Sequence, residues 1–510
     1  MNIALLFIAN ASIMIIEIVG ARAFAPFMGT STEVWSGVIG TVLLGLTLGY
    51  YLGGKFADVI QKQGGSLYKL AGWMVIAAGS FIILSWTHID MISLLGSRLM
   101  GPLGLTLSAA AITLVAFVPA SLFLSALSPT IARIKLSALD NAASTVGSLS
   151  AVAAAGSIVG SFCAGLVFIP YFGSKETLIG VGIVLVVSGI IYGSKAKWSK
   201  KNILVLLLII VLLSISYASG RAAEDVNEAK GIVADIDTRY QRLWVRDEHW
   251  PTNNRDVRVI QTDPFGTQCA MFKDEIGTGK VNPAFAYTVA FKEATNQIVK
   301  AMNFKPKEIT VVGGCNYSFP LYLSQNFKDS HITVAELDPK MEEVAKTWFA
   351  FERPKNMDIV TGDARNFFNA KAQTKADLIY YDAFNSFSTI PHQLATKEAF
   401  ESVKSHMSSE GVLILNVISS IKGNTSQIGG SMYKTLSEVF PFVSFYKIKN
   451  MPDETIQNVI AIASFKEIQM NETFLQKFDA SGFESQMILT DNFAPVERLS
   501  KPIRDYVIKN

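Results

Sequence analysis

The stretch EITVVGGCNYSFPLYLSQNFKDSHITVAELD, residues 308–338, decides the fold of the C-terminal half of the chain. It predicts a strand at 309–312, a tight turn at Gly313-Gly314, a helix, and a second strand at 332–335 that runs into Glu336. This order is typical of the crevice at the carboxyl ends of parallel strands, where nucleosides bind. Glycine lets the backbone approach a ligand closely, and a carboxylate can accept both hydroxyls of a ribose.

The rest of the C-terminal half alternates between strands and helices. Apolar runs predict further strands at 357–360, 376–381 and 411–417. Helices are predicted at 283–302, 339–349 and 397–406. The alternation indicates an α/β Rossmann-like domain with a parallel, doubly wound sheet, over residues 283–510. Alternating apolar and polar residues on both sides of an Asn253-Asn254 turn predict a small antiparallel β-domain at 231–282.

Polar residues follow the predicted parallel strands at one edge of the sheet. They are Gly313-Gly314, Glu336, Asp363 and Asp382. Glu336 can hold ribose hydroxyls, while Asp363 can accept from an adenine amine, with Ala364 leaving room for the ring. Asp382 can bind a positively charged group, either a sulfonium side chain or an amine. The alternative is that these acids are solvated loop residues.

The first 220 residues have the composition of a helical membrane domain. The whole chain is 50% hydrophobic and 17% charged, and nearly all of the apolar excess precedes residue 220. A helix needs about 20 apolar residues to cross a bilayer. Seven such spans are predicted, at 3–24, 34–53, 68–86, 104–127, 146–169, 174–193 and 202–219. The lipid bilayer is therefore an expected partner, whereas a net charge of +3 without a basic stripe argues against nucleic acid.

The basic residues of the short loops predict the orientation of this domain. The loops after spans two, four and six carry Lys55, Lys62, Arg133, Lys135, Lys195, Lys197, Lys200 and Lys201. The loops after spans one, three and five carry Arg22, Arg98 and Lys175. The bias places the even-numbered loops in the cytoplasm, so an odd number of spans leaves the C-terminal domain outside it. A miscounted span would reverse this orientation.

The C-terminal half resembles spermidine synthase, of the polyamine aminopropyltransferase family. The matching pieces are Tyr240-Gln241, Gln268, Asp274-Glu275, Tyr287, Val311–Gly314, Glu336–Pro339, Gly362–Ala364 and Tyr381-Asp382. The whole chain is similar to the bacterial membrane-fused members of that family. Those similarities lie in Glu17 and Arg22, Val34-Trp35, 49–58 and 391–400.

This resemblance implies a membrane-bound transferase in the bacterial inner membrane. Its substrate would be S-adenosylmethionine or the decarboxylated form, and its acceptor a small amine such as putrescine, with methylthioadenosine released and no metal required. The implied catalytic residues are Asp382, Asn385 and Tyr287. The implied cofactor-binding residues are Gln268, Gly313, Gly314, Glu336, Asp363 and Ala364. The family's soluble members associate, so a homodimer is one assembly open to the chain.

The chain departs from the family pattern at the end that handles the amine. The family carries G-G-G-D-G where this chain has Gly313–Tyr317, so Asn316 replaces an Asp. It carries D-S-S-D where this chain has Asp382–Asn385, so a second Asp becomes Asn385, which cannot accept a proton. Two alternatives stay open: a nucleoside- or polyamine-binding module coupled to a transporter-like bundle, and an enzyme that cleaves S-adenosylmethionine without an amine acceptor.

In the family fold the segments that contain Cys269 and Cys315 both border the pocket. Two free thiols are the preferred interpretation. A disulfide between them is the alternative if the domain faces an oxidising compartment.

Overall fold

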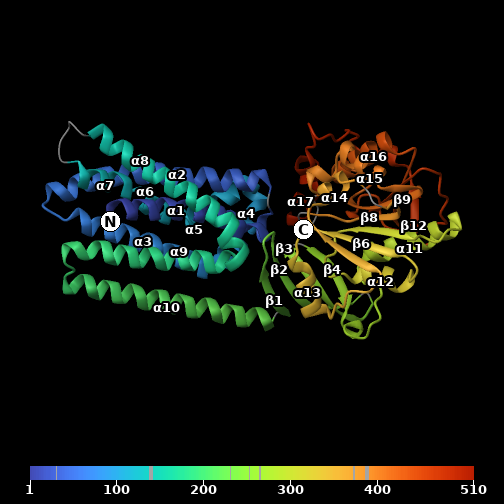
Figure 1. The fold of residues 1–510 in the computed structure, drawn as a ribbon, viewed down its shortest axis with the longest axis horizontal. Helices are drawn as coiled ribbons and strands as arrows, with labels where there is room; N and C mark the ends of the chain where they lie inside the picture. The colour runs from blue at the N-terminus through green and yellow to red at the C-terminus, as the bar shows by residue number, and fades with distance from the viewer. Residues whose placement is uncertain are drawn as a thin grey trace. The chain divides into compact units, whose positions relative to one another are not determined.

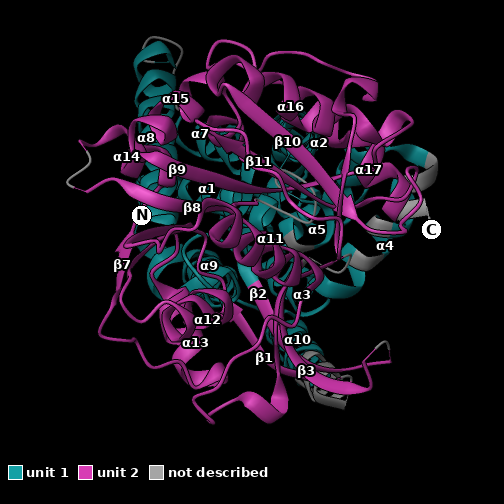
Figure 2. Ribbon diagram, turned by 90° about the vertical axis from the view of Figure 1, so that its right-hand side faces the viewer, with its two compact units in different colours: residues 1–230, 237–242 teal, residues 231–236, 243–510 magenta. Residues whose placement is uncertain are grey.

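The computed structural model describes residues 1–29, 31–136, 142–229, 231–251, 253–263, 266–371, 374–384 and 390–509. They form two compact units, coloured separately in Figure 2. Unit 1 comprises residues 1–230 and 237–242, and unit 2 comprises residues 231–236 and 243–510. The domain boundaries drawn from the sequence, at 220, 231 and 283, stay predictions.

The described residues of unit 1 form helices joined by short loops, apart from the segment 237–242 (Figure 1). Its α-helices are α1 (Asn2–Met28), α2 (Thr32–Lys62), α3 (Leu67–Thr87), α4 (Ile89–Leu103), α5 (Leu105–Ala116), α6 (Val118–Ser125), α7 (Leu127–Lys135), α8 (Ala142–Cys163), α9 (Ile169–Gly193) and α10 (Lys200–Ala229). Helix α4 occupies the predicted loop between the third and fourth spans.

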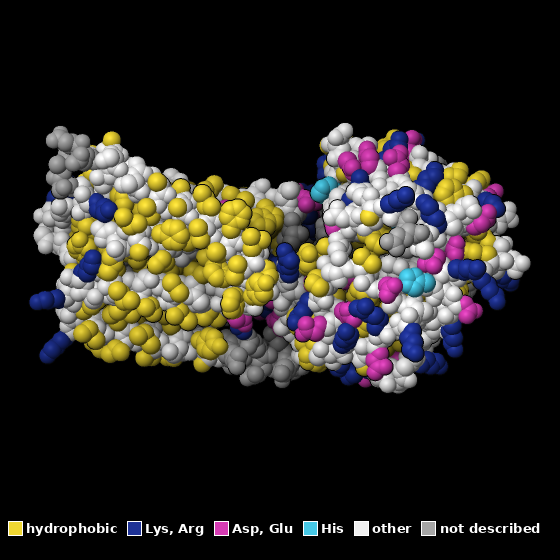
Figure 3. All heavy atoms as spheres, in the orientation of Figure 1, with side chains coloured by type: hydrophobic (Ala, Val, Ile, Leu, Met, Phe, Trp, Pro, Cys, Tyr) yellow, Lys and Arg dark blue, Asp and Glu magenta, His cyan; other side chains and the backbone are white. Residues whose placement is uncertain are grey.

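Apolar side chains cover the visible face of unit 1, whereas charged side chains are scattered over unit 2 (Figure 3). In α10 the side chains of Lys200–Ser219 are exposed or half-buried, apart from Leu206 and Ser216. Leu204, Leu208 and Leu212 are each more than half exposed. A helix that is apolar on all sides and unburied is typical of a membrane span that faces lipid.

The seven predicted spans are not confirmed. In the described part of the chain, five helices are long and apolar enough to cross a membrane, or six if a bent pair counts as one. That pair, Leu105–Ala116 with Val118–Lys135, is bent by 59° where the fourth span was predicted. The fifth and sixth predicted spans lie in one apolar segment, Ala142–Ala196, whose backbone leaves helical geometry at Gly173 (φ 79°).

Arg22, near the end of α1, is paired within unit 1. Its Nη2 lies 2.7 Å from Oδ1 of Asp237, and its Nη1 donates to the carbonyl of Arg239 at 2.6 Å. Asp237 also accepts a hydrogen bond from the backbone N–H of Ser174 at 2.7 Å. The guanidinium of Arg22 therefore links the end of α1 to the segment 237–242.

Unit 2 begins with the four-stranded sheet β1-β2-β3-β4 (β1 Ile232–Asp237, β2 Arg242–Trp250, β3 Arg255–Asp263, β4 Gly266–Phe272). The β2–β3 and β3–β4 pairs are antiparallel, as the sequence predicted for this region.

The second sheet has eight strands in the order β12-β10-β11-β9-β8-β5-β6-β7. Its strands are β5 (Glu308–Val312), β6 (His331–Glu336), β7 (Met357–Thr361), β8 (Ala376–Tyr381), β9 (Met407–Ser419), β10 (Phe442–Ile448), β11 (Gln457–Ser464) and β12 (Leu475–Phe478). Strands β5 to β9 are parallel to one another, which confirms the Rossmann-like prediction. The last three strands add an antiparallel edge that the sequence analysis did not predict.

Helices cover both faces of this sheet. On one face α11 (Ala286–Met302), α12 (Ser318–Asn326) and α13 (Lys340–Phe349) pack in a core with Val311 and Tyr380. On the other face Val312 and Tyr381 join a second core. Its helices are α14 (Ala364–Asn369), α15 (Lys397–Ser405), α16 (Gln427–Val439) and α17 (Val496–Lys509). The alternation of neighbouring residues between two cores is what a strand buried on both faces requires.

The strand order sets the position of the candidate site. From β5 the chain proceeds to β6 and β7 on one side, and then to β8 and β9 on the other side. The strand order therefore reverses beside β5. Ligands of open α/β sheets bind at such a reversal, outside the carboxyl ends of the strands.

Candidate active site

The glycine loop follows β5 directly. Gly313 has φ 90°, and its N–H donates to the carbonyl of Ala335 at 2.9 Å. A Cβ atom at this position would lie 2.4 Å from the carbonyl oxygen of Asp382. Glycine is therefore required here, because the backbone after β5 passes directly against the backbone after β8.

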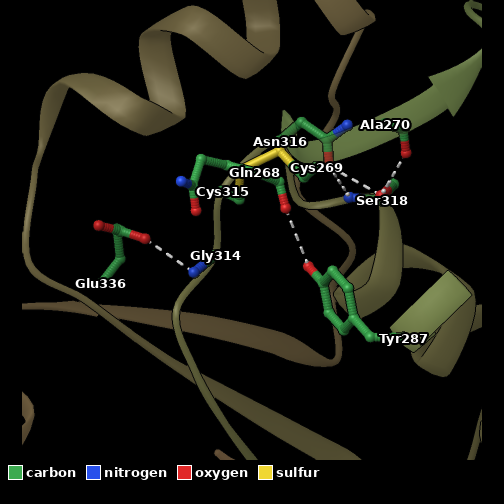
Figure 4. Close-up of a disulfide and its surroundings, with 9 residues drawn as sticks. All are labelled: Gln268, Cys269, Ala270, Tyr287, Gly314, Cys315, Asn316, Ser318 and Glu336. Atoms are coloured by element: carbon green, nitrogen blue, oxygen red, sulfur yellow. Dashed lines mark hydrogen bonds between the residues drawn. A yellow bond between two sulfur atoms is a disulfide. The ribbon is translucent and has the colours of Figure 1, made fainter. Parts of the chain in front are cut away.

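Glu336 is the last residue of β6, and main-chain groups hold its carboxylate. Its Oε2 accepts from the N–H of Gly314 at 2.7 Å (Figure 4). Its Oε1 accepts from the N–H of Asp338 at 2.9 Å. Burial raises the pKa of Glu336, and these N–H groups partly oppose that increase. Each carboxylate oxygen has a second lone pair, so Glu336 can still accept from ribose hydroxyls.

Asp382 follows β8 and is held by side chains. Its Oδ1 accepts from Nδ2 of Asn416 at 2.9 Å, and the hydroxyl of Tyr287 also hydrogen-bonds to it. Burial raises the pKa of Asp382 to about 6, although both hydrogen bonds act in the opposite direction. Because its pKa lies near neutral pH, the carboxylate of Asp382 can act as a general base toward an amine.

Asn416 is a residue of the candidate site that the sequence analysis did not name. It lies on β9, and its Oδ1 accepts from Nδ2 of Asn458 on β11 at 3.1 Å. The signal was present, because Asn416 is the one polar residue in the apolar run 411–417. A polar side chain on a fully buried strand needs a partner, and here that partner is Asp382.

Tyr287 connects Asp382 to the small sheet. It lies in the first turn of α11, and its hydroxyl oxygen lies 3.5 Å from the main-chain carbonyl oxygen of Gln268 on β4. The single hydroxyl proton can serve either this carbonyl or Asp382, but not both at once. Burial raises the pKa of Tyr287 well above its usual value, and the negative charge of Asp382 raises it further. Figure 4 shows the carboxamide of Gln268 directed toward the side of the glycine loop on which Glu336 lies. Three predicted site residues, Gln268, Tyr287 and Asp382, are thus connected.

Asp363 follows β7, and the structure gives it a local partner. Its Oδ1 accepts from the N–H of Arg365 at 2.7 Å, which caps α14. The N–H of Gly362 donates to the carbonyl of Glu336 at 2.9 Å, so β6 and β7 bring both acids to one edge. Ala364 is buried at the start of α14. The roles assigned to Asp363 and Ala364 toward adenine stay predictions.

The preferred interpretation of the cysteines was wrong. Cys269 on β4 and Cys315 in the glycine loop form a disulfide. Cys315 has φ 46° and Tyr317 has φ 58°, although neither residue is glycine. In the family pattern both positions are glycines, which adopt this left-handed region without strain. The last predicted catalytic residue, Asn385, lies outside the described residues.

No protein-family model matches the chain. A polyamine aminopropyltransferase from Vibrio vulnificus is 31% identical over 222 residues, which are 39% of this chain and 71% of that protein. An eEF1A lysine and N-terminal methyltransferase from Bos taurus is 29% identical over 160 residues, or 30% of this chain and 22% of that protein. A crystal structure of a probable spermidine synthase from Corynebacterium glutamicum superposes with a TM-score of 0.43 at 18% identity, covering 50% of this chain and 96% of that one.

The Vibrio relative exceeds 30% identity to this chain and is matched over 71% of its own length. The chain therefore belongs to the polyamine aminopropyltransferase family.

Proposed function

We propose that this chain is a membrane-bound aminopropyltransferase. It binds decarboxylated S-adenosylmethionine, or S-adenosylmethionine itself, beside the glycine loop. The amine nitrogen of an acceptor such as putrescine attacks the sulfonium-bound carbon, the C–S bond breaks, and methylthioadenosine leaves with the electron pair. The sulfonium is already an activated leaving group, so catalysis depends mainly on holding the nucleophile and the carbon in line.

The observation that supports this proposal is the pair of buried carboxylates on the two strands that flank β5. Glu336 ends β6 and Asp382 follows β8, on opposite sides of β5. A donor bound at the end of β5 would therefore lie between the two carboxylates, with its ribose toward Glu336. Asp382, with its pKa raised to about 6, is suited to stabilise a cationic amine and to accept its proton after attack. The hydroxyl of Tyr287 beside it can orient the amine.

A second candidate is methyl transfer from intact S-adenosylmethionine to an amine. The bovine relative bears a methyltransferase name. The resemblance also expects an Asp near the aminopropyl end, where this chain has Asn316. A neutral amide there would not repel the carboxylate of intact S-adenosylmethionine, whereas an Asp would.

One assay separates these functions. The purified full chain in detergent is incubated with putrescine and either decarboxylated or intact S-adenosylmethionine, and the products are resolved by mass spectrometry. Methylthioadenosine with spermidine supports aminopropyl transfer, and S-adenosylhomocysteine with a methylated amine supports methyl transfer. Methylthioadenosine without an aminopropylated product supports cleavage without an acceptor. Binding without turnover supports the binding-module alternative, and the absence of both binding and turnover contradicts the proposal.

We propose further that unit 1 crosses the membrane seven times and leaves unit 2 outside the cytoplasm. The count treats Ala142–Ala196 as two crossings, because 55 residues greatly exceed one bilayer and the helix is broken at Gly173. The lysine and arginine bias of the loops supports this orientation. The Cys269–Cys315 disulfide also supports it, because such bonds persist in oxidising compartments. Labelling of substituted cysteines in intact and broken cells tests both the number of crossings and the orientation. The proposed assembly is a homodimer.

A further inference from the structure

The disulfide joins the two segments that carry the candidate site. Cys269 follows Gln268, whose carbonyl oxygen lies 3.5 Å from the hydroxyl of Tyr287. Cys315 follows Gly314, whose N–H donates to Glu336. Figure 4 shows the bond between the sulfurs with these partners on either side. Breaking this disulfide would therefore free both the segment next to the ribose end and the segment next to the amine end of the site.

The glycine loop has a backbone that its own residues disfavour. Cys315 and Tyr317 both lie in the left-handed region, at φ 46° and 58°. Residues with a Cβ adopt this region at a cost, and they stay in it when surrounding structure holds them there. Tyr317 is held by burial and by stacking on Phe351, with ring centroids 4.7 Å apart. For Cys315 the restraints are the bond to Cys269 and a hydrogen bond from its backbone N–H to Glu336.

Other contacts near the disulfide do not replace it. The hydroxyl of Ser318 lies 3.3 Å from the carbonyl oxygen of Ala270 on β4, but it lies only 2.7 Å from Oδ1 of Asn316. Its single proton therefore favours Asn316, and the link to β4 is weak. Cys269 is 2% exposed within an apolar core, so a reduced Cys269 would stay packed as a small apolar side chain. Cys315 is the more exposed of the two residues and offers a reductant its point of attack.

We propose that the Cys269–Cys315 disulfide is a redox-sensitive positioning element for the adenosyl site, and this rests on the proposed function. Oxidised, it keeps the glycine loop in the conformation that presents Gly314 and Glu336 to the ligand. A dithiol reductant breaks the S–S bond, gives one thiol on each cysteine, and is itself oxidised to a cyclic disulfide. The loop then relaxes toward backbone angles that Cys315 prefers, and affinity for the nucleoside falls while the two cores of unit 2 persist.

The test compares oxidised and reduced full chain in detergent. Affinity for methylthioadenosine is measured by isothermal titration calorimetry before and after treatment with dithiothreitol, with thiols counted by mass spectrometry. Reduction is expected to weaken binding about tenfold, or about 1.4 kcal/mol. Helix content by circular dichroism is expected to stay unchanged. Cys163→Ser, which alters the free cysteine outside the pair, is the matched control and should retain the wild-type response.

Two double variants separate tethering from loop strain. Cys269→Ala with Cys315→Ala should bind weakly whether or not reductant is present. Cys269→Ala with Cys315→Gly should regain most of the affinity without any disulfide, because glycine adopts φ 46° freely. A merely structural bond would not give this rescue by glycine.

Equal affinity of the oxidised and fully reduced forms would overturn the positioning role and leave the proposed function intact. Absence of methylthioadenosine binding in both forms would overturn the two together. Equal weakening in the Ala and Gly double variants would show that the bond does not act through the backbone of residue 315, and would also contradict the proposal.

Discussion

The two ends of the candidate site hold their carboxylates in different ways. Glu336, at the ribose end, is held by the N–H groups of Gly314 and Asp338, which are parts of the backbone. Asp382, at the amine end, is held by the side chains of Asn416 and Tyr287. A backbone-held group survives most substitutions around it, whereas a group held by side chains depends on two particular residues. The amine end is therefore the part of the site that can change its chemistry while the ribose end is kept.

Asp382→Asn should have the largest effect on the transfer rate. We expect kcat to fall about 100-fold or more, because a positioned proton acceptor contributes roughly 10²- to 10⁴-fold. The variant should fold, since a buried neutral amide replaces a carboxylate whose pKa burial has already raised. The measurement is kcat with saturating donor and putrescine, alongside the affinity for methylthioadenosine, which should change less than about threefold. An unchanged kcat would show that Asp382 is not the proton acceptor, and would contradict its assignment to the amine end of the site.

Glu336→Gln should show the opposite pattern. Its amide nitrogen would face N–H donors, and the ribose would lose a charged acceptor, at a cost of about 2–3 kcal/mol. Methylthioadenosine should bind about 30- to 100-fold more weakly by calorimetry. At saturating donor, kcat should stay within about fivefold of the wild type. A loss confined to kcat would contradict the ribose assignment.

Asn416→Leu should shift the pH dependence of the amine end. Activity of the wild type should rise with pH through about 6, as Asp382 ionises. Removing the Asn416 donor raises the pKa of Asp382, so this limb should move up by about one pH unit, the equivalent of one hydrogen bond. The measurement is kcat against pH. Asn458→Leu, which removes the partner of Asn416 and keeps the donor to Asp382, is the control and should move the limb less.

The same pKa predicts a dependence of stability on pH. Because the pKa of Asp382 is raised from 3.8 to about 6 in the folded protein, its contribution to the free energy of unfolding is fully present below pH 3.8. It is lost as pH rises through about 6. Unfolding of Asp382→Asn should lack this loss, and identical pH profiles would contradict the burial of the carboxylate.

His331→Gln should have the smallest effect. His331 lies at the amino end of β6, remote from the site edge, where Nδ1 is 3.2 Å from Glu308 and Nε2 is 3.0 Å from Asp358. Burial lowers its pKa, but the two carboxylates outweigh burial and raise it. Any stabilisation is present below pH 6.5 and lost as pH rises through the raised pKa, and it should be under about 1 kcal/mol for such exposed pairs. Affinity for methylthioadenosine should not change, and a large change would show that the two edges of the sheet are coupled.

The sequence predicted the features of unit 2 that depend on short-range patterns. Strands β5 to β9 are apolar runs of ordinary length, and Gly313 and Glu336 follow directly from the order of elements around them. The parallel sheet then places their ends at one edge, so the meeting of Gly313 with the backbone of Asp382 could be anticipated. The antiparallel β10–β12 edge was missed because the sequence analysis predicted no strand after residue 417.

Features that depend on distant partners were predicted less well. Asn416 acquires its role from a residue 34 positions away, and the disulfide joins cysteines 46 positions apart. Hydropathy alone also divided Ala142–Ala196 into two spans without indicating how its helices continue through residue 168. In each case the deciding information is a contact in space, which a single sequence carries only weakly.

Helix α11 lies in the sequence between Cys269 and Cys315, inside the loop that the disulfide closes. A growing chain holds both thiols only after β5 has been synthesised, so oxidation comes late, and its agent is whatever the surrounding compartment supplies. Under the proposed positioning role, newly made chains would bind the nucleoside weakly until the disulfide forms. The fraction of chains that contain the disulfide would then increase with the time since their synthesis.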